Sequence, residues 1–275
     1  MPVKIDLYFT FPQKNSEWPG ANVVLIDVLR STTSICHGLA AGCSRILPAA
    51  DLGEVTELVE SLGRSRLLLG GEKDARRIPG FELGNSPAEY ASPRVKGHTV
   101  VMLTSNGTAA LVRLRHQRTV AIVSLVNLGA AARWLTGQNK DVVILCAGHR
   151  EQFCLEDAVC AGMLVRRLLQ VWPEADTRLN DAARVGLALE VRYGADPRAC
   201  LEEASHGRSL LEQGFGADLD LCSRVDELDL LPFYHDEQIT LRPPAPVAET
   251  VEDEEQGDEE PRLPDAERRE SQELA

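Results

Sequence analysis

The sequence lacks several features that would define other classes of protein. It has no apolar run close to the 18 residues expected of a membrane-spanning helix. A strand-like pattern starts at Val3, with no charged-then-apolar secretory leader before it. The seven cysteines include no C-x-x-C pair, and their odd number argues against a disulfide framework or a zinc site. We therefore expect a cytoplasmic protein without membrane association, whose thiols are reduced and mostly buried.

The chain also has no excess of basic charge. Its formal net charge is −13, from 29 Lys and Arg against 42 Asp and Glu. From position 243 onward there are 12 acidic and 3 basic residues, which leaves 30 acidic and 26 basic residues in the body. Nucleic-acid binding requires a basic face, so we expect none. Residues 243–275 are rich in Pro, Glu, Asp and Arg without apolar periodicity, and this composition predicts a disordered acidic tail.

Residues 1–242 alternate between strand-like and helical patterns. Nearly continuous apolar runs, such as Val-Val-Leu-Ile, are typical of strands that helices cover on both faces. The predicted strands are Val3–Phe9, Asn22–Leu29, Arg45–Pro48, Leu67–Gly70, Thr99–Leu103, Thr119–Val126 and Val142–Cys146. The predicted helices between them are Thr32–Ala41, Leu52–Leu62, Thr108–Leu114, Leu128–Thr136 and Leu155–Leu169. This alternation predicts a three-layer α/β/α fold with a mainly parallel sheet, built as one domain or as two intertwined α/β halves.

Beyond Pro173 we expect no further strand pattern. Helices are predicted at Asn180–Tyr193, Pro197–Ser205 and Ser209–Gln213. Short elements at Asp226–Tyr234 and Ile239–Leu241 close the body. The C-terminal part of the body is therefore predicted to be mainly helical.

Ligands of an open parallel sheet bind at the carboxyl ends of its strands. Asp27 ends an apolar strand, where a carboxylate is costly unless it is paired or binds a metal. The simpler alternative is that Asp27 pairs with Arg30 while Ser31 or Thr32 caps a helix. Glu72 follows two glycines that allow close backbone approach, although such a turn can also be plain surface loop.

Two further loops carry polar groups after apolar strands. Asn85 lies in the loop before Pro87, where it could line a site or, like Ser86, cap the next helix. The segment Ser105-Asn106-Gly107-Thr108 offers N–H groups and hydroxyls that suit a phosphate, with ordinary helix capping as the alternative. It lacks the spacing and the lysine of a nucleotide-binding P-loop.

A fifth strand end leads through His149 and Arg150 into a helix whose first turn holds Glu156 and Asp157. Acidic residues favour a helix N-terminus in any case, and His149 and Arg150 are more typical of exposed loops. Carboxylates from three loops (Asp27, Glu72, and Glu156 or Asp157) could nevertheless converge. Such oxygen ligands suit Mg²⁺, which can bind phosphate oxygens and activate a water.

The segments IDVLRSTTSI, LGGE, IPGFELGNSPAEY, LTSNGT and CAG-x4-F-x-LED-x2-CAG occur in this order between Val24 and Gly162. Together they resemble the 2-phosphosulfolactate phosphatases, a family found in coenzyme M biosynthesis. The resemblance implies Mg²⁺-dependent hydrolysis of (R)-2-phospho-3-sulfolactate to sulfolactate and phosphate. It implies catalytic roles for Asp27, Arg30 and Glu156, and metal-ligand roles for Asp27, Glu72 and Asp157. The implied substrate- or phosphate-binding residues are Asn85, Ser105, Asn106, Gly107 and Thr108.

The substrate of that family carries phosphate, sulfonate and carboxylate groups, so the site must supply positive potential. Arg150, with Lys73, Arg76 and Arg77 as further candidates, could do so beside Arg30. The turn at His149 and Arg150 departs from the family, in which an aromatic residue is expected there, and could alter substrate preference.

Two mechanisms and two functions stay open. A metal-activated water could attack, with Asp27 or Glu156 as ligand and base and with Arg30 holding the phosphoryl group. A phosphoenzyme through Asp27 is the rival, although the D-x-D-x-T/V pattern is absent. The alternative function is a non-catalytic binder of small phosphorylated metabolites on the same fold. The chain could assemble as a homodimer.

Overall fold

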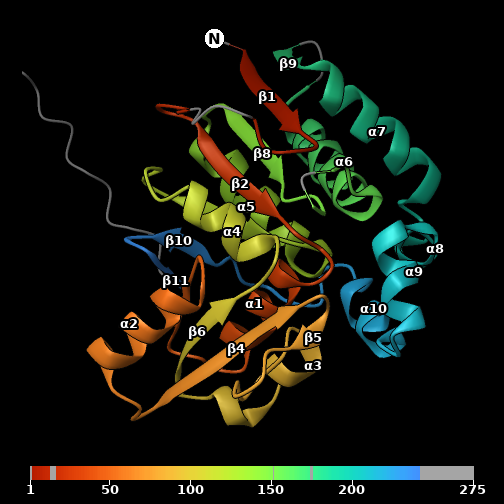
Figure 1. The fold of residues 1–275 in the computed structure, drawn as a ribbon. Helices are drawn as coiled ribbons and strands as arrows, with labels where there is room; N and C mark the ends of the chain where they lie inside the picture. The colour runs from red at the N-terminus through yellow and green to blue at the C-terminus, as the bar shows by residue number, and fades with distance from the viewer. Residues whose placement is uncertain (1, 13–16, 151, 174–175, 242–275) are drawn as a thin grey trace, which may run out of the picture. The chain divides into compact units, whose positions relative to one another are not determined.

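A computed structural model describes residues 2–12, 17–150, 152–173 and 176–241. The predicted acidic tail, 243–275, lies outside these described residues. Within them, eleven strands form one sheet in the order β5-β4-β6-β3-β11-β10-β7-β2-β8-β1-β9 (Figure 1). The strands are β1 Val3–Tyr8, β2 Asn22–Ile26, β3 Arg45–Pro48, β4 Leu67–Lys73, β5 Arg76–Arg77, β6 Thr99–Leu103, β7 Val120–Val123, β8 Val142–Cys146, β9 Thr177–Leu179, β10 Phe233–His235 and β11 Gln238–Thr240.

Ten α-helices accompany these strands in the described part of the chain. They are α1 Ser31–Ala40, α2 Leu52–Leu62, α3 Pro87–Tyr90, α4 Gly107–Arg113, α5 Leu128–Gln138, α6 Leu155–Val171, α7 Asp181–Tyr193, α8 Pro197–Glu203, α9 Ser205–Glu212 and α10 Gly216–Cys222. Each strand and helix predicted before Pro173 is present, which confirms the mainly parallel α/β fold. None of the described helices is long and apolar enough to cross a membrane.

The expectation of no strand beyond Pro173 is wrong. The short strand β9 pairs in parallel with β1 at one edge of the sheet, and β10 and β11 form an antiparallel hairpin inside it. Each of these strands has three residues, too few for a periodic apolar pattern to mark them in the sequence. Their partners in the sheet, rather than their own composition, make them strands.

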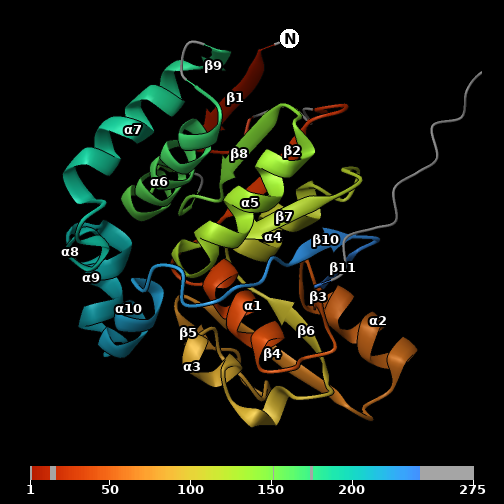
Figure 2. The ribbon, with the colours of Figure 1, turned by 180° about the vertical axis from the view of Figure 1, so that it is seen from behind.

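Helices cover both faces of the central strands. Along β2, Val24 and Ile26 pack into the cluster formed with α5 and α6, whereas Val23 and Leu25 pack into the cluster formed with α1 and α4. Figures 1 and 2 show these helices from opposite sides. Burial of successive residues on both faces explains the unbroken apolar runs of the sequence. All seven cysteines are free thiols and buried, as the sequence predicts.

The strands on the two sides of the β10–β11 hairpin run in opposite directions. One parallel part contains β4, β6 and β3, and the other contains β7, β2, β8, β1 and β9. The steps from β3 to β11, to β10 and to β7 are all antiparallel, so β3 and β7 run in opposite directions. In Figure 1 the arrows of β2 and β4 converge near β5. The carboxyl ends of both parallel parts therefore meet at one place.

Helix α7 packs on α6 through two glycines. A methyl group added to Gly162 of α6 would overlap the carbonyl oxygen of Gly186 in α7, so only hydrogen allows this approach. The helix pair fixes the start of the C-terminal helices α8, α9 and α10, which lie beside the meeting point of the two sheet parts (Figure 1).

The substitution Gly162→Ala is expected to lower the free energy of unfolding by about 1–3 kcal/mol, because overpacking forces the two helices apart. Denaturant unfolding followed by circular dichroism measures the change. The matched control is Gly137→Ala in α5, where an added methyl group meets no atom within 4 Å. That control should be neutral or slightly stabilising; equal losses for both variants would contradict the close-packing argument.

Candidate active site

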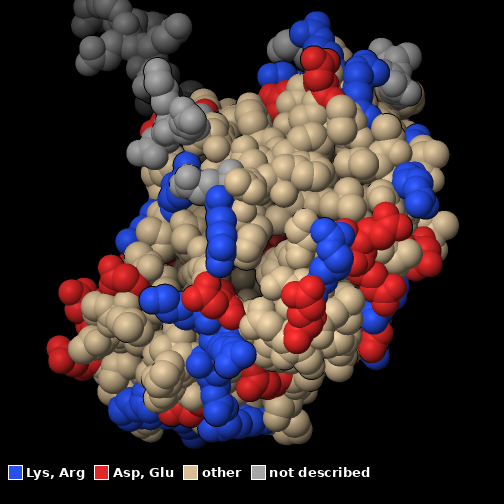
Figure 3. Space-filling model, turned by 45° about the vertical axis from the view of Figure 1, so that its right-hand side comes forward, with Lys and Arg blue, Asp and Glu red and all other residues tan. Residues whose placement is uncertain are grey.

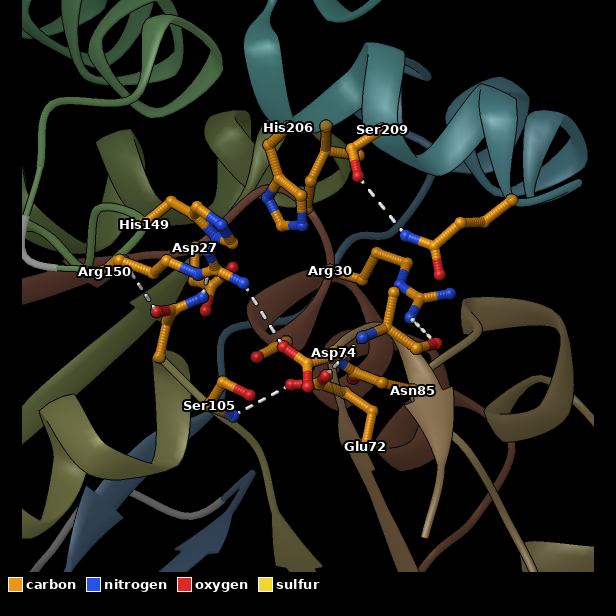
Figure 4. A pocket seen from close by; sticks show the side chains of 15 residues that line it. Asp27, Arg30, Glu72, Asp74, Asn85, Ser105, His149, Arg150, His206 and Ser209 are labelled. Atoms are coloured by element: carbon orange, nitrogen blue, oxygen red, sulfur yellow. Dashed lines mark hydrogen bonds and ion pairs between the residues drawn. The ribbon is translucent and has the colours of Figure 1, made fainter.

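A cavity of about 130 Å³ lies where the two parallel parts of the sheet meet. Figure 3 shows the surface hollowed there, with charged side chains of both signs at the rim, and Figure 4 shows the side chains that line it. They come from the end of β4 and the first residue of α1, from the loops after β2, β4, β6 and β8, from the loop before α3, and from α9 with the residue that follows it. The lining residues are Asp27, Leu29, Arg30, Ser31, Glu72, Asp74, Ala75, Asn85, Ser105, Asn106, His149, Arg150, His206, Ser209 and Gln213.

Asp27 is held at the carboxyl end of β2 by its own backbone. Its N–H donates to Thr32 Oγ1 (3.1 Å), and its carbonyl oxygen accepts from the Thr32 hydroxyl (2.8 Å) and N–H (3.0 Å). The residue is only 4% exposed. Burial raises the pKa of the Asp27 carboxyl to about 6, against the opposing effects of His206 and of a hydrogen bond from Ser31. Asp27 can therefore exchange a proton near neutral pH.

Gly107 allows the start of α4 to approach Asp27. A side-chain carbon at this position would lie 2.7 Å from Asp27 Oδ2 and would overlap Ser31. The residue does not line the cavity, so the structure accounts for Gly107 by close packing. Its predicted role in phosphate binding stays a prediction.

Arg30 is fixed by contacts from three directions. Its Nη1 donates to Asp218 Oδ2 of α10 (2.6 Å), and its Nη2 donates to the carbonyl oxygen of Ala75 (2.9 Å). The guanidinium also lies over the ring of Phe215, 4.5 Å from its centroid. The alternative that Arg30 pairs with Asp27 is thus wrong, because Asp218, 188 positions away, is its partner. A guanidinium held in this way presents its cavity side in a fixed orientation.

Asp218 also organises the loop before α3. The Ser86 hydroxyl donates to Asp218 Oδ1 (2.5 Å), and neither Ser86 nor Asn85 caps α3 with its side chain. Pro87 occupies the first turn of α3 as expected. Asn85 lines the cavity, and its buried Oδ1 has no hydrogen-bond partner among the described residues. A buried acceptor in this state is suited to a ligand.

Glu72 links the loops that follow β4 and β6. Its Oε2 accepts the N–H of Ala75 and its Oε1 accepts the N–H of Ser105, both at 2.8 Å. Ser105 and Asn106 line the cavity, and their predicted role in phosphate binding stays a prediction. Thr108 does not line it, because Thr104 and Thr108 exchange hydrogen bonds of 2.8 and 3.0 Å between N–H groups and hydroxyls. The mutual bonds with Thr104 account for Thr108, and the N–H groups of Ser105 and Thr108 are already paired.

Asn106 fixes the turn after β8. Its Oδ1 accepts the N–H of Arg150 (3.2 Å), and its Nδ2 lies 3.3 Å from His149 Nδ1. His149 is half-buried and stacks on His206, with ring centroids 4.5 Å apart. The expectation that His149 is an exposed loop residue is therefore wrong. Arg150 is exposed, and its guanidinium pairs with exposed Asp74 at the cavity rim (3.2 Å).

Glu156 and Asp157 are both 2% exposed and lie beside the cavity rather than in its wall. Asp157 Oδ1 accepts the N–H of Val28 (2.8 Å), and its Oδ2 accepts the N–H of Gly148 (3.3 Å). Burial, with Glu156 next in effect, raises the pKa of the Asp157 carboxyl well above its ordinary value. Asp157 thus joins the loops after β2 and β8. Glu156 Oε1 lies 3.6 Å from His206 Nδ1.

The oxygen atoms that line the cavity could supply a hard cation with some of its ligands, but not with a complete set. Among the described residues, no three His, Cys, Asp or Glu side chains come together as a metal-binding group. Mg²⁺, however, commonly takes one or two carboxylates and completes its shell with water and substrate phosphate. The Asp27 carboxylate and the unpaired Oδ1 of Asn85 both line the cavity and fit this pattern.

Sequence reasoning missed the contributions of the C-terminal helices. His206, Ser209 and Gln213 line the cavity, and Asp218 holds Arg30. These residues stand in ordinary helical patterns, without a polar residue in an apolar run or a glycine-rich turn to mark them. Asp74 and Ala75, in the turn after β4, also escaped notice.

The comparisons with known proteins agree with a site for a small phosphate ester. A cavity at the carboxyl ends of parallel strands, with a fixed guanidinium and a buried carboxylate, suits a phosphoric monoester hydrolase, and the chain is an enzyme of this class. Residues 9–237 match the family described as 2-phosphosulpholactate phosphatase. The chain belongs to this family.

Its relatives include three proteins named "Probable 2-phosphosulfolactate phosphatase". That of Symbiobacterium thermophilum is 38% identical over 225 residues, covering 82% of this chain and 96% of the relative. That of Carboxydothermus hydrogenoformans is 36% identical, with 85% and 94% covered. That of Cyanothece sp. is 36% identical, with 84% and 96% covered. The likeness thus spans the body of the chain.

The substitution Asp218→Ala is expected to lower the free energy of unfolding by about 3–5 kcal/mol, because it leaves the buried Arg30 guanidinium without its partner. Thermal or denaturant unfolding measures the loss. Asp229→Ala removes the partner of Arg133 from a mostly exposed pair and serves as the control. Exposed pairs contribute little, so a comparable loss in both variants would show that the burial of Arg30 is not what matters.

The buried carboxyl of Asp27 should make stability depend on pH. Its pKa of about 6 in the fold exceeds the ordinary 3.8, so the fold favours the protonated form. This contribution is fully present below pH 3.8, is lost as the pH rises through about 6, and amounts to on the order of 3 kcal/mol. In metal-free buffer, Asp27→Asn should therefore be more stable than the wild type at pH 8 and similar to it at pH 4. If the melting temperatures of the two proteins differ by the same amount at every pH, the raised pKa of Asp27 is refuted.

Proposed function

We propose that this protein hydrolyses (R)-2-phospho-3-sulfolactate to sulfolactate and phosphate in a Mg²⁺-dependent reaction. The observation that carries the proposal is the buried Asp27 carboxylate in the same small cavity as the fixed guanidinium of Arg30. Its relatives are named as probable phosphatases of this substrate, and the family match covers residues 9–237.

The charges in the cavity support a role for a divalent cation. Among the described residues, the carboxylates of Asp27, Glu72 and Asp74 line it, against the guanidinium groups of Arg30 and Arg150. Both guanidinium groups are paired with carboxylates, Arg30 with Asp218 and Arg150 with Asp74. A substrate with phosphate, sulfonate and carboxylate groups would meet too little positive charge. Mg²⁺ bound by Asp27 and Asn85 would offset the negative charge and lower the pKa of a water.

The protein's own groups then divide the work of phosphoryl transfer. Arg30 orients the phosphoryl group and stabilises the charge that gathers on its oxygens. Asp27 accepts the proton of the attacking water. Arg150, exposed at the rim, can meet the sulfonate or carboxylate of the substrate.

A phosphate-release assay tests the proposal. The wild-type protein with Mg²⁺ should release phosphate from phosphosulfolactate, and a chelator such as EDTA should suppress the release. Asp27→Asn should reduce kcat/KM by about 100-fold or more, because both the base and a cation ligand are lost. Asp229→Asn, the same chemical change at an exposed site, should leave activity unaltered.

Other outcomes separate the alternatives. A shift in melting temperature with phosphosulfolactate but no phosphate release would favour a non-catalytic binder of phosphorylated metabolites. Full activity in EDTA would refute the metal dependence while leaving the hydrolysis in place. A homodimer and a cytoplasmic location also stay predictions, and analytical ultracentrifugation of the full chain tests the former.

A further inference from the structure

The two histidines that stack at the cavity wall have different surroundings. His149 faces an amide: because Asn106 Oδ1 accepts the N–H of Arg150, Asn106 Nδ2 is directed at His149 Nδ1 and donates to it (3.3 Å). His149 Nδ1 then carries no proton. Burial lowers the pKa of His149 further, with His206 and Arg150 acting in the same direction. His149 is therefore held as a neutral imidazole.

His206 faces a carboxylate instead. Its Nδ1 lies 3.6 Å from Oε1 of Glu156, which is an ion-pair distance rather than a hydrogen bond. Glu156 is 2% exposed, so this contact lies away from bulk water. The carboxylate lies beside Nδ1 and orients the ring. No described residue pairs with Nε2, and Figure 4 shows the ring of His206 in the cavity wall above Asp27 and Arg30.

We propose that His206 is the general acid that protonates the leaving oxygen of the substrate, with Glu156 as the residue that positions it. This assignment rests on the proposed function. The bond between phosphorus and the ester oxygen breaks as the water oxygen bonds to phosphorus. The proton of the water passes to Asp27, and the Nε2 proton of His206 passes to the departing alkoxide. After product release, Asp27 returns its proton to solvent and His206 takes one up.

The other groups of the cavity are unsuited to this task. The hydroxyls of Ser31, Ser105 and Ser209 and the guanidinium groups of Arg30 and Arg150 hold their protons too tightly near neutral pH. Asp27 is occupied as the base, and His149 is held neutral by Asn106. An alkoxide is a poor leaving group that benefits from protonation in the transition state. Glu72 accepts two N–H groups and Asp74 pairs with Arg150, so both are engaged as acceptors. His206 is the remaining donor of this kind among the described lining residues.

The leaving group of the substrate provides the test. His206→Gln should lower kcat/KM for phosphosulfolactate by about 100-fold or more, whereas its loss with para-nitrophenyl phosphate should be at least about tenfold smaller, because that leaving group needs no proton. The control His98→Gln changes a histidine at the opposite end of β6 from Ser105 and should leave both rates unaltered. If His206→Gln lowers kcat/KM equally for both esters, His206 is not the general acid. An unchanged circular dichroism spectrum of the variant would exclude misfolding as the cause of the loss.

A double-mutant cycle on phosphosulfolactate tests the positioning role without the aryl ester. Glu156→Gln should lower kcat by about tenfold in the wild-type background and cause little further loss in the His206→Gln background. Independent, multiplying losses would overturn the link between Glu156 and His206. Wild-type protein that releases no phosphate would overturn the proposed function and the assignment with it, whereas active wild type with an unimpaired His206→Gln variant would overturn the assignment alone.

Discussion

The antiparallel ladder from β3 through β11 and β10 to β7 is the constraint on which the rest of the structure depends. A sheet of parallel strands alone would present all its carboxyl ends along one edge. Here the ladder reverses the strand direction, and the twist of the sheet turns the two parallel parts so that their carboxyl ends face one another (Figure 1). Loops from both parts thereby reach one small cavity, and polar groups that would lie far apart along an edge become neighbours.

Crowding carboxylates into this place costs free energy, and the fold offsets the cost with backbone N–H groups and a cationic partner. Glu72 and Asp157 each accept two N–H groups from loops after different strands, and Asp218 accepts from Arg30 and Ser86. Each of these carboxylates joins segments that are distant in sequence. Asp27 differs, because its carboxylate faces the cavity and burial raises its pKa to about 6. Of these carboxylates, Asp27 is the one that lines the cavity beside Arg30 and can meet a ligand there.

The C-terminal helices complete a site that the strand loops leave unfinished. α10 supplies Asp218, which sets the orientation of Arg30, and α9 supplies His206, which stacks on His149. Two similar imidazoles thus receive opposite partners, an amide for His149 and a carboxylate for His206.

The sequence by itself determined the parallel strands, their covering helices and most of the strand-end residues in the cavity wall. Apolar runs and strand-end polar residues are local patterns, and Asp27, Arg30, Glu72, Asn85, Ser105, Asn106 and Arg150 all follow from them. Only the tertiary structure decided that Thr108 pairs with Thr104, that Asp157 braces two loops, and that Asp218 and His206 join the site. The contact between Arg30 and Asp218 spans 188 positions. No local periodicity encodes such a contact, because it depends on the path of the whole sheet and its reversal at β10 and β11.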